Sequence, residues 1–195
     1  MAISYEPVPP SPCRWTKDQY DKMYEMGWFI DRHVELIAGE IIEEGRMTQS
    51  HWVSVNLAGN LLPALVRPNY CVSVRSPLNL GADSEPRPDI AVCAGGPRDY
   101  LDAMPTTAAL IIEAADFTIV EDRHRKGSLY ARAGAPDYWI VNLRKCILEV
   151  YREPVLMRHK PFGYGYEKVS AFFADETVSP LAMPETHIAV SALLP

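Results

Sequence analysis

The segment that decides the fold lies between residues 87 and 142. It consists of four patterned stretches: RPDIAVC at 87–93, AALIIEA at 108–114, DRHRKGSLYARA at 122–133 and YWIV at 138–141. The first predicts a short apolar strand opened by an acid, and the second a strand covered on both faces. The third carries charges on one side and Leu129 and Tyr130 on the other, which predicts a helix ended by Gly134 and Pro136. The fourth is again a buried strand, so helices are expected to cover a sheet.

The flanking sequence adds elements on both sides. Thr16 begins a capping-box pattern with Gln19, which predicts the start of a helix. Residues 33–45 hold two short apolar runs around a turn and indicate a hairpin, and a helix is expected from Thr48 or Ser50 to about Leu65. Further strands are expected at 69–75, 147–151, 166–172 and 188–190. We predict a single mixed α/β (α+β) domain over residues 15–195, after a flexible Pro-rich arm at 1–14.

Composition distinguishes a globular intracellular domain from a membrane, secreted or zinc-binding protein. The chain has 195 residues, of which 48% are hydrophobic and 23% charged, so one domain can bury its own core. The sequence contains neither a run long enough for a membrane span nor a readable signal peptide. The four cysteines are widely spaced, which disfavours a zinc site and suggests reduced thiols. We therefore expect a cytoplasmic protein without a membrane partner or an organic cofactor.

Net charge bears on the partners. The formal charge of −6 excludes a surface that is basic throughout, because non-specific affinity for DNA comes mostly from neutralised phosphates. A local basic patch is still compatible with that charge; Arg123, Arg125, Arg132, Arg144 and Lys145 could form a rim for phosphates or a solvated face. The acidic balance also suits a site whose carboxylates hold a divalent cation.

Three charged residues stand on or beside apolar strands in the deciding segment. Asp89 opens one strand, Glu113 lies near the end of the next, and Lys126 follows in the helix. Carboxylates at the ends of neighbouring buried strands could share a Mg²⁺ ion, and an ammonium group could orient the attacking water. Each residue also has a simpler interpretation. Asp89 could be a turn acid, Glu113 part of a buried ion pair, and Lys126 a surface partner of Asp122.

Taken in order, these motifs resemble the Uma-two family, whose members have the restriction-endonuclease-like PD-(D/E)xK fold. The hairpin Val34–Glu40 resembles the ELIDGE hairpin of that family, and His51 falls where its members often carry a histidine. The resemblance covers about residues 30–155. It implies a central mixed sheet flanked by helices and a metal site for Mg²⁺ or Mn²⁺ at Asp89 and Glu113. It also implies a catalytic set of Asp89, Glu113 and Lys126 for hydrolysis of DNA phosphodiester bonds.

Two departures from the pattern concern the lysine and a neighbouring acid. The superfamily usually places its lysine two residues after the second acid, where this chain has Ala115. Lys126 is the natural substitute, since the family's own Asp-Arg-x-x-Lys segment matches residues 122–126. Asp116 retains an acid after the second strand, and it could cap the following helix or join the metal shell.

Further candidates lie outside this set. Glu35 or Glu40 could supply a third carboxylate or could be surface acids of the hairpin, and His51 could contact the site or only cap its helix. Tyr130 and the Tyr138–Trp139 pair are expected in the core.

The leading functional hypothesis is a Mg²⁺-dependent DNA endonuclease that acts as a homodimer, because two-fold symmetry matches duplex DNA. The N-terminal arm and the segment Val178–Pro195 are candidate interface pieces. The alternative is a catalytically silent nucleic-acid-binding or oligomerisation module on the same fold. RNA or a small nucleotide as substrate is a further, weaker option.

Overall fold

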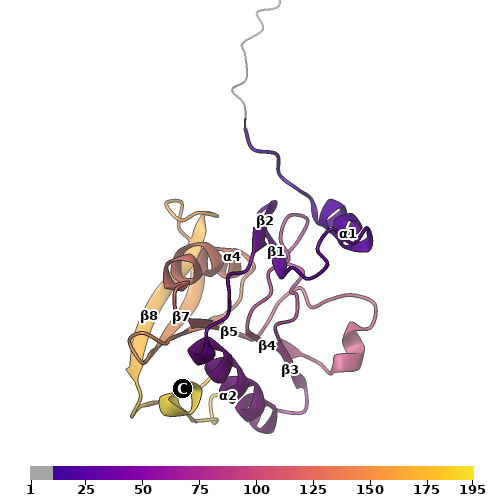
Figure 1. Cartoon of the computed structure of the whole chain (residues 1–195). Coiled ribbons are helices and arrows are strands. Elements are labelled where there is room, and N and C mark those ends of the chain that lie inside the picture. Colours follow the sequence, from indigo (N-terminus) through magenta and orange to yellow (C-terminus); the bar gives the residue numbers. More distant parts are fainter. Residues whose placement is uncertain (1–10) are drawn as a thin grey trace, which may run out of the picture.

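Six strands form one mixed sheet in the order β3–β4–β5–β6–β7–β8 (Figure 1). The computed structural model describes residues 11–195. Neighbouring strands are antiparallel except β5 and β6, which run parallel. The strands are β3 (Tyr70–Val74), β4 (Ile90–Ala94), β5 (Leu110–Ala115), β6 (Asp137–Asn142), β7 (Ile147–Leu156) and β8 (Tyr164–Phe173).

The connection between the two parallel strands is helical. It consists of α3 (Ile119–Glu121), the π-helical turn η2 (Asp122–Lys126) and α4 (Gly127–Arg132). The predicted helix is confirmed but begins earlier, at Ile119, and contains a wide turn that the pattern did not indicate. It ends as expected, because Gly134 takes the left-handed conformation with φ of 74°. Crossovers of this kind are what parallel strands require.

One face of the sheet is covered by α2 (Gln49–Leu65), whose N-cap is Thr48 as expected. Val55, Ala58 and Leu62 pack there against strand residues that include Trp139. The C-terminal segment joins the same core through β9 (Thr177–Val178), β10 (Ile188–Ala189) and η3 (Val190–Leu193), which lie beside α2 in Figure 1. Val178, Met183, Ile188, Val190 and Leu193 of the segment 178–195 are therefore core residues of their own chain.

The opposite face is covered by α4. Tyr130 and Ala131 pack on Ile111, Tyr138 and Ile140, so the expected core positions of Tyr130 and Tyr138 are confirmed. The two faces together explain the apolar run of β5, every residue of which is buried.

The N-terminal elements stand beside the sheet. The capping box at Thr16 is present and opens α1 (Lys17–Glu25). The hairpin consists of β1 (Val34–Ile37) and β2 (Glu40–Glu43), and α1 packs on it through Tyr20 and Met23. Backbone hydrogen bonds between Leu36 and Glu85 attach β1 to the chain that leads into β4. The arm predicted at 1–14 lies mostly outside the described residues; residues 11–14 are exposed and have no regular structure.

The architecture is the mixed α/β arrangement that the sequence predicts, with helices on both faces of a central mixed sheet. Within residues 11–195, no helix combines the length and the apolar character that a membrane crossing requires.

Candidate active site

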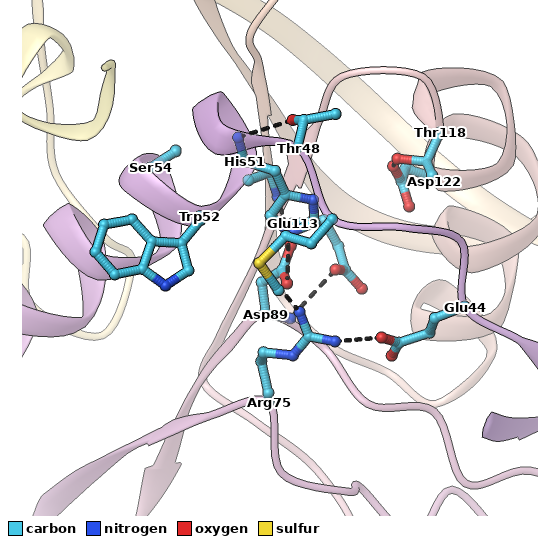
Figure 2. Close-up of polar contacts among 12 residues, drawn as sticks. Glu44, Thr48, His51, Trp52, Ser54, Arg75, Asp89, Glu113, Thr118 and Asp122 are labelled. Carbon is cyan, nitrogen blue, oxygen red and sulfur yellow. Dashed lines mark hydrogen bonds and ion pairs between the residues drawn. The ribbon is translucent and has the colours of Figure 1, made fainter. Parts of the chain in front are cut away.

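A cavity of about 360 Å³ opens at one end of β4 and β5. Its walls come from the hairpin, the β2–α2 loop, the first turn of α2, the end of β5 and the turn η2. Figure 2 shows His51, Asp89 and Glu113 grouped beside one another, with Thr118 and Asp122 on the connection that follows β5. Asp89, Glu113 and Lys126, which lie far apart in the sequence, therefore meet in one place.

Asp89 is held at the beginning of β4. The β4–β5 register pairs Ile90 with Ile112, and its continuation sets Asp89 opposite Glu113. The Oδ2 atom of Asp89 accepts the amide of Ala114 at 2.9 Å, and Oδ1 lies 2.9 Å from Nε2 of His51. Burial disfavours the charged form, but the hydrogen bond and charge of His51, the Ala114 amide and the charge of Lys126 together outweigh it and lower the pKa of Asp89. Asp89 is thus an oriented carboxylate that stays ionised.

Glu113 is a buried side chain that lines the cavity. Its Oε1 atom accepts the Lys126 ammonium at 3.1 Å and the Tyr130 hydroxyl at 2.7 Å, and Oε2 accepts the amide of Asp89 at 3.2 Å. Burial raises the pKa of Glu113 well above its ordinary value, and the nearby ammonium only partly opposes this. The β5 strand places the carboxylate here because Glu113 lies opposite Asp89 in the register.

Lys126 is the buried cation of this group. Its Nζ atom lies 3.1 Å from Glu113 and 3.5 Å from Oε1 of Glu35. Burial opposes the charge, but the surrounding carboxylates, Glu113 first, raise the pKa of Lys126 well above its ordinary value. Glu35 is fixed by its other oxygen, which accepts the amide of Arg87 at 3.0 Å.

Asp122 precedes Lys126 by one turn of η2. It is buried, and its Oδ2 atom accepts the hydroxyl of Thr118 at 2.6 Å. Burial raises the pKa of Asp122 to about 6. Its carbonyl accepts both the Gly127 amide and the Tyr138 hydroxyl, so the wide turn is tied to β6. Turns of this kind are frequent at functional sites.

Of the two hairpin acids, the structure brings only Glu35 to the cavity. Glu40 lies at the turn, where Arg125 and Arg14 pair with it and lower its pKa. Asp116 lines the cavity. It does not cap the following helix, whose N-cap is Thr118, and its carboxylate pairs with Arg144.

A phosphate rim was one of two interpretations of Arg123, Arg125, Arg132, Arg144 and Lys145, and these residues do not border this cavity. Each of the four arginines pairs with a carboxylate, and none of the five residues lines the cavity. The arginines that line the cavity are instead Arg75, Arg87 and Arg46, the last from the β2–α2 loop. Arg75 pairs with Glu44 (Figure 2), whereas no carboxylate in the described part of the chain pairs with Arg46 or Arg87.

Sequence reasoning missed three contributions. Tyr130 was expected only in the core, and its hydroxyl contact with Glu113 has no signal in a hydropathy pattern. Asp122 was considered only as a surface partner of Lys126, because its burial depends on the wide turn. Arg87 stood in the quoted motif, yet only the attachment of the hairpin shows that it lines the cavity.

The donor set fits a divalent cation. Among the cavity residues, carboxylates outnumber the positively charged side chains: the acids are Glu35, Glu43, Glu44, Asp89, Glu113, Asp116, Glu121 and Asp122, and the bases are Arg46, Arg75, Arg87 and Lys126. Within residues 11–195, no three His, Cys, Asp or Glu side chains are clustered as a ready metal cage. Mg²⁺ needs only one or two protein carboxylates, because waters and phosphate oxygens complete its shell.

Comparisons with known proteins bear on the fold and the family of the chain. A crystal structure titled as a putative nuclease belonging to DUF820, from Anabaena variabilis ATCC 29413, matches with a TM-score of 0.68 and 18% sequence identity. The match covers 91% of this chain and 96% of that chain, and at this identity it concerns the fold. No curated protein matches the sequence. The Uma2 family model, described as "Putative restriction endonuclease", matches residues 18–191, which is most of the chain. The chain therefore belongs to the Uma2 family, and the resemblance read from its motifs is confirmed.

Proposed function

We propose that this protein is a metal-dependent endonuclease that hydrolyses DNA phosphodiester bonds in the cavity at Asp89 and Glu113. The observation that carries the proposal is the opposed pair of buried carboxylates with the Lys126 ammonium in contact with one of them. Membership of the Uma2 family, described as "Putative restriction endonuclease", supports the same reaction class.

Asp89 and Glu113 are the groups that would hold Mg²⁺ or Mn²⁺. A carboxylate has about four lone-pair positions. Asp89 uses two on His51 and Ala114, and Glu113 uses three on Lys126, Tyr130 and the Asp89 amide. Each carboxylate therefore retains at least one lone-pair position for a cation. When bound, the ion supplies a more acidic water and neutralises phosphate charge.

The other groups have roles that follow from their protonation. Lys126 stays an ammonium, so it orients the attacking water or stabilises charge on phosphorus but does not remove a proton. Asp122, with a pKa near 6, is suited to accept the proton of the water near neutral pH. His51 orients Asp89. Arg46 and Arg87, which have no carboxylate partners among the described residues, are the groups that would contact phosphates.

The experiment is nicking of a supercoiled plasmid with Mg²⁺ and Mn²⁺. Asp89→Asn and Glu113→Gln keep the shape of the side chains and remove their charge. Glu40→Gln is the matched control, because Glu40 is a hairpin acid outside the cavity. We expect each cavity variant to lose about 100-fold or more of the rate, as loss of one key electrostatic group does, while the control cleaves at the wild-type rate. Circular dichroism checks that all proteins are folded.

A wild-type protein that is inert with both metals would contradict the proposal, as would cavity variants that cleave like the control. Either result would favour the silent binding module.

We further propose that the enzyme acts as a homodimer, because cutting both strands of a duplex with one site per chain calls for two sites related by two-fold symmetry. Analytical ultracentrifugation tests this; a monomer at working concentration would contradict it.

A further inference from the structure

One aromatic ring at the cavity is conspicuously exposed. Phe117 lines the cavity and is 70% exposed, although burying such a ring ordinarily stabilises a protein. Other exposed aromatic residues of the described chain, such as Trp28 and Phe173, do not line the cavity. The indole of Trp52 points away from Asp89 and Glu113 in Figure 2. The position of Phe117 at the site therefore calls for an explanation that the proposed hydrolysis does not supply.

The ring is supported from one side. The guanidinium of Arg144 lies over it, with Cζ 4.3 Å from the ring centroid. Asp116 holds this guanidinium through an ion pair in which Nε and Oδ1 are 3.4 Å apart. Phe117 lines the cavity, whereas Arg144 does not. Because Arg144 occupies one face and most of the residue is still exposed, the ring keeps surface on which a flat partner could stack.

The ring is also tethered close to the reacting groups. Phe117 follows Glu113 by four positions in the chain, and four residue steps span at most about 14 Å. Ala114, between them, donates its amide to Asp89. A nucleic acid whose phosphate lies at Asp89 and Glu113 would carry a neighbouring base past Phe117.

We propose that Phe117, backed by Arg144, is a stacking platform for an unpaired nucleobase next to the phosphate at Asp89 and Glu113. This inference rests on the proposed function and adds a substrate class: DNA that is single-stranded, or locally unpaired, at the site of cleavage. An aromatic face beside a cationic group is the usual means of holding such a base, because every base has a π face to stack. A base inside a duplex is already stacked on both faces and cannot use the platform.

The test measures binding of the full-length protein to a short fluorescein-labelled single strand by anisotropy. Ca²⁺ is present, since it is a cation with the same preference for oxygen ligands. The strand is also prepared with one abasic position, moved along its length, which removes a base and keeps every phosphate. Phe117→Ala removes the ring, and Phe117→Trp keeps a stacking surface. Phe173→Ala is the matched control, because Phe173 is 61% exposed on β8 and lies outside the cavity.

We expect Phe117→Ala to weaken binding of the intact strand by about 5- to 150-fold, the range that corresponds to the loss of one stacked base. Phe117→Trp and Phe173→Ala should bind like the wild type. One abasic position should weaken binding by the wild-type protein by a similar factor. It should not weaken binding by the Phe117→Ala protein any further. With a blunt duplex of the same sequence, the Phe117→Ala protein should bind as tightly as the wild type does. A merely structural role of Phe117 would not produce this dependence on one base.

Wild-type protein that binds intact and abasic strands equally overturns the platform, as does a Phe117→Ala protein that binds like the wild type. Plasmid nicking is scored separately. Phe117-dependent binding without any nicking would count against the proposed hydrolysis alone. Nicking that persists without any effect of Phe117 on binding would count against the platform alone.

Discussion

At the scale of single residues, the charge of Lys126 is central because buried carboxylates surround it. Glu113 lies 3.1 Å and Glu35 3.5 Å from its Nζ atom. Lys126→Met keeps most of the side-chain length and removes the charge. We expect nicking to fall by about 100-fold, while Mn²⁺ binding remains or becomes tighter, since the site becomes more negative. Rates and Mn²⁺ binding isotherms check this; loss of Mn²⁺ binding in the variant would make Lys126 a structural group instead.

Asp122 gives a prediction on pH dependence at the same scale. Its pKa is raised from 3.8 to about 6, so the folded state binds this proton more tightly than the unfolded state does. The stabilising contribution is therefore complete below pH 3.8 and is lost as the pH rises through about 6. Asp122→Asn removes the ionisation. Between about pH 4 and 8, the unfolding free energy of the variant should gain about 2–3 kcal/mol relative to the wild type.

Urea unfolding in EDTA at both pH values measures this difference. A stability difference that stays constant with pH would show that Asp122 titrates normally.

At the scale of elements, the hairpin that carries Glu35 has a strained turn. Ala38 and Gly39 connect β1 and β2 with φ of 47° and 78°, as a two-residue type I′ turn requires. Asn-Gly is the preferred pair there, so Ala38→Asn should raise the unfolding free energy by about 0.5–1 kcal/mol. Gly39→Ala should lower it by about 1 kcal/mol or more, because its Cβ would lie 2.8 Å from Cβ of Arg14.

Thermal or urea unfolding of the two variants, beside the wild type, checks both predicted changes in unfolding free energy. Equal stability of Ala38→Asn and Gly39→Ala would mean that the turn differs in solution.

Most elements could be predicted because their signals are local. The capping box at Thr16, the apolar run of β5 and the glycine after α4 depend on neighbouring residues alone. The wide turn η2 could not, because the Tyr138 hydroxyl that supports it comes from β6. Which of Glu35 and Glu40 reaches the cavity also could not be predicted from neighbouring residues. The register sets both on the same face of the hairpin, and arginines from distant segments bind Glu40 at the turn.

At the scale of the whole molecule, the net charge leads us to expect that a cation binds before DNA does. The chain carries a net charge of −6, and acids outnumber bases in the cavity. Phosphates should therefore be repelled until a cation is bound. We expect DNA binding to be undetectable in EDTA and to appear with Ca²⁺ or Mg²⁺, as anisotropy can measure. That Asp89 and Glu113 lie close together could be expected from the sequence, because both acids stand on or beside neighbouring apolar strands. The excess of acids over bases in the cavity could be seen only in the folded chain.

Affinity for DNA that is equal in EDTA and in Ca²⁺ would contradict the charge argument, and it would point to a basic surface outside the cavity.

The central claim is that the cavity at Asp89 and Glu113 is a divalent-cation site. Binding of Mn²⁺ without nucleic acid, followed by calorimetry, tests it most directly with wild type, Asp89→Asn and Glu40→Gln. We predict saturable binding to the wild type and to Glu40→Gln, and its loss in Asp89→Asn. Equal binding to wild type and Asp89→Asn, or no binding to the wild type, would contradict the claim.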